Sequence, residues 1–293
     1  KDWKQLSVPP WFCNTTKKIK NFITSKDCRI FALFAKSSLS APTTTFKKWP
    51  RRDAIPFIET AGEPVFRRGL LLYMNHWIDN LEQVDHGGIK YWMRKDNFID
   101  KQCFRESVEQ DDYRLSSLIG KIDCVIDIGA CQGVFAVRAN SLLACPVYSF
   151  EPHPDNFKIL TLNAQNKYPR IYPFEGAFVP RGTSKRGFLT SDGHEAANHL
   201  TDEGIPVLGW GYNDILALIP GNERCLLKLD FEGGEDVAIR DMIGSNYKSL
   251  HIAGEWHHDP EPVRRALLET GCQNIEVQET GDITGLFFAT KGV

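Results

Sequence analysis

The feature that most constrains this chain is an apolar segment that leads through a turn with two glycines into a helix. The segment from Cys124 to Phe135 reads CVIDIGACQGVF. Its first half predicts a buried strand ending near Ile128, and the pattern from Val134 onward predicts a helix. Glycine lets the backbone take strained dihedrals and approach a ligand closely, and a helix start has unpaired N–H groups. The segment therefore predicts a small-molecule site.

The acidic residues around this turn narrow the choice of ligand. Glu151 ends the next apolar run, 24 residues after Asp127, where nucleotide-binding β-α-β units place a carboxylate on the ribose. A dinucleotide site needs the pattern G-x-G-x-x-G, but Cys131 stands in place of the second glycine. The pyrophosphate interpretation is therefore weakened. Asp127 suits a ligand with a cationic, amino-acid-like end, such as S-adenosylmethionine.

Three motifs in order resemble the FkbM family of S-adenosylmethionine-dependent methyltransferases. They read VIDIGAxxGVF at 125–135, FEPHPxNF at 150–157 and LLKLDFEGGE at 226–235. The resemblance implies that Asp127, Gly129 and Gly133 surround the methionine part of the cofactor, that Glu151 binds the ribose hydroxyls, and that Ala177 lies against the adenine. Ala130 and Pro152, in the same motifs, are also predicted cofactor contacts.

The second half of the chain alternates strands and helices, as a doubly wound, Rossmann-like α/β fold does. We expect a mostly parallel sheet with an antiparallel strand near the C-terminus, formed by a methyltransferase domain over 116–293. Residues 180–205 predict an insertion of loops or short antiparallel strands. The expected strands are 122–128, 147–150, 171–174, 225–229, 250–253, 275–278 and 286–289. The expected helices are 134–143, 154–166, 212–218, 235–243 and 261–270.

Candidate catalytic residues follow the later strands. Carboxyl ends of neighbouring parallel strands meet at one rim of a sheet, which would gather Asp230 and Glu255 near Asp127 and Glu151. Such crowding makes sense around a cation. Asp230 is the first choice for contacting an acceptor hydroxyl, with Glu232 and Glu255 beside it. His257 is the candidate general base, because histidine titrates near neutrality. A less favoured alternative places Mg²⁺ or Mn²⁺ on Asp230, Glu255 and His257.

Residues 1–115 predict a basic, aromatic-rich accessory region. The first 60 residues hold twelve Lys or Arg against four acids, a local charge of +8. Since the whole chain has a net charge of −2, the remaining residues carry a charge of −10. Five of the seven tryptophans also lie before residue 115. This asymmetry is typical of an arm that binds a polyanion, or of a solvated basic surface. It supports RNA ribose 2′-O-methylation as an alternative activity, with RNA as partner.

Composition places the chain among ordinary globular proteins. No apolar run approaches the ~18 residues of a membrane span. The eight cysteines are scattered without a C-x-x-C pair, which favours reduced thiols and a cytoplasmic location. The leading hypothesis is O-methyl transfer to a hydroxyl of a saccharide or glycosylated metabolite, the substrate class that the family resemblance implies. A catalytically silent cofactor-binding scaffold is the alternative from another class.

Overall fold

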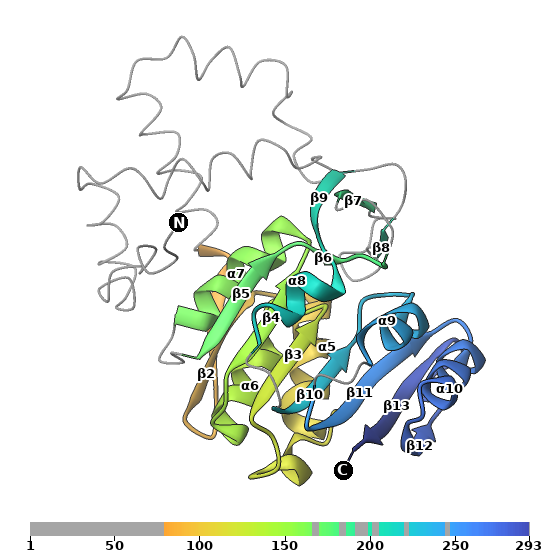
Figure 1. Cartoon of the computed structure of the whole chain (residues 1–293). Helices are drawn as coiled ribbons and strands as arrows, with labels where there is room; N and C mark the ends of the chain where they lie inside the picture. Colours follow the sequence, from red (N-terminus) through yellow and green to blue (C-terminus); the bar gives the residue numbers. More distant parts are fainter. Residues whose placement is uncertain are drawn as a thin grey trace. The chain divides into compact units, whose positions relative to one another are not determined.

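The structure is a computed structural model, and it describes residues 79–165, 170–181, 186–190, 199–200, 205–219, 223–243 and 247–292. A seven-stranded sheet forms its centre (Figure 1). Its strand order is β12-β13-β11-β10-β3-β4-β5. The strands are β3 (Cys124–Ile128), β4 (Val147–Glu151), β5 (Ile171–Glu175), β10 (Arg224–Leu229), β11 (Ser249–His257), β12 (Gln273–Val277) and β13 (Thr284–Lys291).

The sheet is mostly parallel with one reversed strand. β3 pairs in parallel with β4 and β10, β4 with β5, and β10 with β11, whereas β13 runs antiparallel to both β11 and β12. This arrangement is a doubly wound, Rossmann-like α/β fold, with the antiparallel strand near the C-terminus as predicted.

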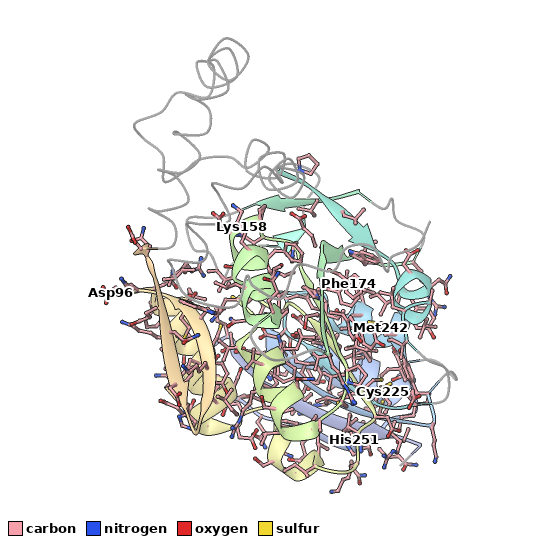
Figure 2. The ribbon with its side chains drawn as sticks, turned by 90° about the vertical axis from the view of Figure 1, so that its left-hand side faces the viewer. Asp96, Lys158, Phe174, Cys225, Met242 and His251 are labelled. Carbon is pink, nitrogen blue, oxygen red and sulfur yellow. The ribbon has the colours of Figure 1, made fainter. Side chains whose placement is uncertain are left out.

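Helices cover both faces of the sheet because alternate strand residues enter two separate cores. Val125 packs in a first core with the helices α6 (Val134–Leu143) and α7 (Pro154–Gln165). Ile126 packs in a second core, which also contains Cys225 and Met242, both labelled in Figure 2. The helices of this second face are α8 (Tyr212–Leu216), α9 (Glu235–Met242) and α10 (Pro260–Glu269).

Most elements begin and end within a few residues of their predicted bounds, but β11 is longer. The strand was expected to end at Ala253. Instead it continues to His257, paired with β13. Gly254 is needed within the strand, since a Cβ there would lie 2.7 Å from Cε1 of Phe287. Glu255 and His257 are thus strand residues on one face.

The compact unit that contains the sheet begins at Gln83, earlier than the predicted domain boundary near 115. Tyr91, Phe104 and Tyr113 are buried in the first core, which explains why this stretch belongs with the sheet. The segment contains β1 (Leu81–His86), β2 (Ile89–Arg94), α5 (Phe98–Phe104), the π-helix η3 (Arg105–Gln110) and the 3-10 helix η4 (Leu115–Leu118). The basic stretch 1–60 lies outside the described residues.

The insertion before α8 contains short strands, as predicted. β9 (Ile205–Trp210) pairs in parallel with β6 (Ala177–Phe178) and antiparallel with β7 (Arg186–Thr190). β7 also pairs antiparallel with β8 (His199–Leu200). Among the residues that the structure describes, no helix is both long enough and apolar enough to cross a bilayer.

Candidate active site

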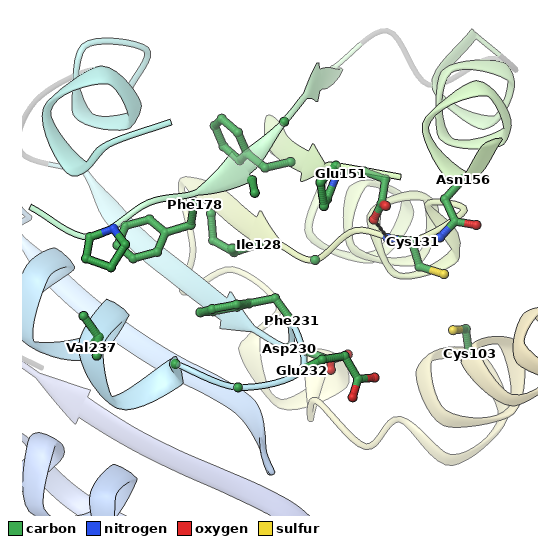
Figure 3. A pocket seen from close by; sticks show the side chains of 18 of the residues that line it. Cys103, Ile128, Cys131, Glu151, Asn156, Phe178, Asp230, Phe231, Glu232 and Val237 are labelled. Atoms are coloured by element: carbon green, nitrogen blue, oxygen red, sulfur yellow. Dashed lines mark hydrogen bonds between the residues drawn. The ribbon is translucent and has the colours of Figure 1, made fainter. Parts of the chain in front are cut away.

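A cavity of about 500 Å³ opens at the carboxyl ends of β3, β4 and β10 (Figure 3). This edge of an open α/β sheet is where ligands usually bind. Six predicted site residues line the cavity: Gly129, Glu151, Pro152, Ala177, Asp230 and Glu232. The three strands therefore bring residues from all three sequence motifs to one space.

The turn after β3 depends on two glycines for different reasons. Gly129 has a φ of +81°, and a Cβ at this position would collide with the backbone carbonyl oxygen of Asp230. Gly133 has a φ of +84°, and its Cβ would lie 2.6 Å from Cδ1 of Leu160 in α7. Gly129 thus lets the ends of β3 and β10 come together at the cavity, whereas Gly133 lets α6 and α7 pack. Gly133 and the buried Ala130 do not line the cavity.

Glu151 is held rigidly at the end of β4. Its Oε1 accepts a hydrogen bond from the backbone N–H of His153 (2.7 Å), and its Oε2 accepts one from that of Cys131 (2.8 Å). The residue is 4% exposed. Burial raises the pKa of Glu151 to about 7, although the two backbone hydrogen bonds and Lys228 act to lower it. The two amides leave each oxygen a further lone pair for hydroxyl donors.

The other end of the cavity is apolar. The rings of Phe178 and Phe231 lie with centroids 6.1 Å apart, and Val237 lines the cavity near them (Figure 3). Aromatic and aliphatic side chains of this kind suit a flat heterocycle. Ala177, which precedes Phe178, lines the same space.

Asp127 does not line the cavity. It is fully buried, and its Oδ1 lies 3.3 Å from Nζ of Lys228 while its Oδ2 accepts a hydrogen bond from Ser149 (3.1 Å). A cation of the protein itself, Lys228, therefore lies against this aspartate.

Lys228 links this buried carboxylate to the cavity. Its Nζ lies 3.3 Å from Oδ2 of Asp230 and donates a hydrogen bond to the carbonyl oxygen of Gly129 (2.6 Å). Burial would lower the pKa of Lys228, but the charges of Asp230 and Asp127 raise it above its usual value. The lysine thus stays charged and joins β10 to the turn after β3.

Asp230 is oriented by Tyr113, whose hydroxyl donates a hydrogen bond to Oδ2 (2.8 Å). Burial would raise the pKa of Asp230, but Lys228, His257 and the Tyr113 hydrogen bond hold it below its usual value. The carboxylate is therefore ionised at neutral pH. It lines the same cavity as Glu151.

Glu255 and His257 lie beside Asp230, just beyond the residues that line the cavity. Burial and the charge of Asp230 raise the pKa of Glu255 to about 8. Burial would lower the pKa of His257, but a hydrogen bond to Glu235 and the neighbouring carboxylates raise it to about 9. The general-base role of His257 remains a prediction, and its ring lies among Glu232, Glu235 and Asp230.

Sequence reasoning missed three residues of the site: Tyr113, Lys228 and Glu235. Lys228 had a signal, because a lysine inside a buried apolar strand needs a charged partner. Glu235 lies in the LLKLDFEGGE motif, but nothing there marks it as the partner of His257. Tyr113 lies 117 positions from Asp230, and no local pattern connects them.

No protein-family model matches the sequence, and no curated protein matches it. Several solved structures are similar. TYW2 of Pyrococcus horikoshii in complex with MeSAdo shares 14% identity over 72% of this chain and 70% of its own, with a TM-score of 0.44. Precorrin-6y C5,15-methyltransferase of Geobacter metallireducens shares 15% identity over 62% and 87%, with a TM-score of 0.41. At these sequence identities the likeness concerns the fold, and the ligand and reaction of this chain are argued from its own residues.

Proposed function

We propose that the chain is an S-adenosylmethionine-dependent O-methyltransferase of the FkbM family that acts on a hydroxyl of a saccharide or glycosylated metabolite. One observation carries the proposal. Gly129 of the glycine turn, the amide-bound Glu151 and the ionised Asp230 all line the same cavity. A donor site and an acceptor site thus share a single space at the carboxyl edge of the sheet.

The residues that line the cavity fit S-adenosylmethionine. Glu151 would accept hydrogen bonds from the ribose hydroxyls, because two backbone amides hold its carboxylate in place at the cavity. Pro152 and Ala177, with the apolar wall at Phe178, would hold the adenine. Gly129 would lie against the methionine part. When bound, the cofactor supplies a methyl group activated by its sulfonium.

Three predicted cofactor residues act indirectly in this proposal. Asp127, Ala130 and Gly133 are withdrawn from the cavity. Asp127 holds Lys228, which in turn binds the carbonyl of Gly129. Together these contacts fix the shape of the turn, and the cofactor meets the turn's backbone.

Asp230 would receive the acceptor hydroxyl. Tyr113 and Lys228 hold its Oδ2 in place, so Oδ1 is the oxygen that can accept the acceptor's hydrogen bond. Positioning of the hydroxyl contributes much of the rate in such a transfer. Glu232, which also lines the cavity, would bind further hydroxyls of the acceptor.

The charges near Asp230 favour a neutral acceptor over a phosphorylated one. Glu106, Glu232 and Glu255 surround it, and Asp230 and burial raise the pKa of Glu106 above its usual value. The ionised Asp230 would repel a phosphate placed beside it. A sugar ring offers hydroxyl donors to the same groups. RNA remains the alternative acceptor through the basic stretch 1–60, which the structure does not describe.

Calorimetry with S-adenosylmethionine and with NAD tests the cofactor, and we expect saturable binding of the first alone. Saturable binding of NAD alone would reject the methyltransferase. An acceptor screen with labelled S-adenosylmethionine, using glycans, glycosylated metabolites and RNA, then tests the substrate class. Label transferred to RNA only would support the ribose 2′-O-methyltransferase. Tight cofactor binding with no labelled product in any class would favour the silent scaffold.

A further inference from the structure

Three side chains with metal-binding atoms meet at the ends of two neighbouring parallel strands. Leu229 of β10 is in register with Gly254 of β11, so the next residues along the strands, Asp230 and Glu255, are neighbours. His257 is two residues further on the same face of β11. One oxygen of each carboxylate and one nitrogen of His257 all lie within 4.8 Å of one another.

The histidine is held in the orientation that metal-binding histidines have. Its Nδ1 lies 3.1 Å from Oε1 of Glu235, a carboxylate that is 2% exposed and also accepts a hydrogen bond from the backbone N–H of Gly233 (3.0 Å). A carboxylate on one ring nitrogen fixes the tautomer and directs the other nitrogen to the ion. Nε2 accordingly faces the acidic side, 3.5 Å from Oε2 of Glu232.

The two carboxylates have oxygens to offer. Tyr113 and Lys228 contact Oδ2 of Asp230, and none of the described residues donates a hydrogen bond to its Oδ1. Within the described part of the chain, Glu255 accepts no hydrogen bond at all, although it is partly buried and close to other acids. A carboxylate in such surroundings is stabilised by a cation.

We propose that Asp230, Glu255 and His257 bind one divalent cation. Two carboxylate oxygens and one imidazole nitrogen suit Mn²⁺, and Mg²⁺ less well because it prefers oxygen ligands. Since Asp230 lines the cavity, the ion's open positions face the acceptor side. There it would polarise the acceptor hydroxyl and ease loss of its proton. This role rests on the proposed function, but binding of the ion does not.

Titration of the full-length chain with Mn²⁺, followed by electron paramagnetic resonance, tests the site without cofactor or acceptor. We expect one Mn²⁺ bound per chain, and at least tenfold weaker binding in each of Asp230→Asn, Glu255→Gln and His257→Ala. Glu235→Gln leaves the three ligands in place and should weaken binding by about tenfold, because it removes only the group that orients His257.

The matched controls keep the residue types and leave the cluster intact. His251→Ala changes another histidine of β11, and Glu276→Gln changes an acid that pairs with Arg114. Both should bind Mn²⁺ as the unchanged chain does, and thermal melting checks that every variant is folded. Failure of the unchanged chain to bind Mn²⁺, or equal loss in the controls, would overturn the site. In that case Lys228 and a protonated His257 balance the acids without an ion.

Binding of S-adenosylmethionine, measured separately, tells the two proposals apart. Mn²⁺ binding without cofactor binding would keep the cation site and reject the methyltransferase. Cofactor binding with turnover that excess chelator does not reduce, in a chain that binds no Mn²⁺, would keep the methyltransferase and reject the cation site.

Discussion

The two sides of the cavity are built in different ways. The donor side, which comprises the turn Gly129–Gly133 and Glu151, is formed by backbone: glycines with positive φ and a carboxylate held by two amides. The acceptor side, which comprises Asp230 with Glu255 and His257 just beyond it, is formed by charged side chains that two neighbouring strands bring together. The donor side should therefore respond to changes of shape, and the acceptor side to changes of charge.

Asp230→Asn should separate the two sides most clearly. The amide is nearly isosteric but cannot accept a proton or carry the charge, so we expect turnover to fall about 10²–10⁴-fold, the usual range for such groups. Affinity for S-adenosylmethionine, measured by calorimetry, should stay within about twofold. A normal turnover number would remove Asp230 from the reaction, and a matching loss of cofactor affinity would show that the two sides are not independent.

Lys228→Met should damage both sides, because this lysine is shared by them. It leaves Asp127 and Asp230 without their common cation, and removal of one partner from a buried ion pair costs about 3–5 kcal/mol of unfolding free energy. Denaturant unfolding measures this loss. Lys158→Met is the matched control, since Lys158 is also mostly buried but pairs with an Asp155 side chain that is 53% exposed. It should cost at most about 1 kcal/mol, and equal losses would show that Lys228 has no linking role.

Gly129→Ala tests the backbone construction of the donor side. The added Cβ would lie 2.7 Å from the carbonyl carbon of Asp230, so we expect cofactor affinity to fall at least tenfold and unfolding free energy to fall by about 2–3 kcal/mol. Gly120→Ala is the control, because Gly120 has a φ of +76° but nothing within 4 Å of an added Cβ. Gly120→Ala should lower the unfolding free energy only by the cost of holding an alanine at positive φ, about 1 kcal/mol. Equal effects of the two substitutions would mean that the close approach to β10 is unimportant.

The difference between the donor side and the acceptor side also decided what could be predicted from the sequence. The donor side is local: a buried strand, two glycines and a helix start are adjacent in the chain, so α6 was predicted with its observed bounds. The acceptor side joins distant residues, and neither Tyr113 on Asp230 nor Lys228 on Asp127 can be inferred without the strand register. The end of β11 was predicted too early, since its last residues pair with the distant strand β13, and the sequence alone does not show that pairing.

The smallest expected effect is a pH dependence confined to the donor side. Burial raises the pKa of Glu151 to about 7, and the ionised carboxylate is the form that accepts hydrogen bonds from both ribose hydroxyls. The ionised fraction rises about tenfold between pH 6 and pH 8, so affinity for S-adenosylmethionine should rise by about the same factor and level off above that range. Glu151→Gln should bind S-adenosylmethionine weakly, because it lacks the carboxylate. Its affinity should not change with pH, because an amide does not titrate. This flat pH profile would exclude His153 as the source of the pH dependence. If affinity instead fell as pH rose, the neutral acid would be the binding form, and Glu151 would donate to the ribose instead of accepting from it.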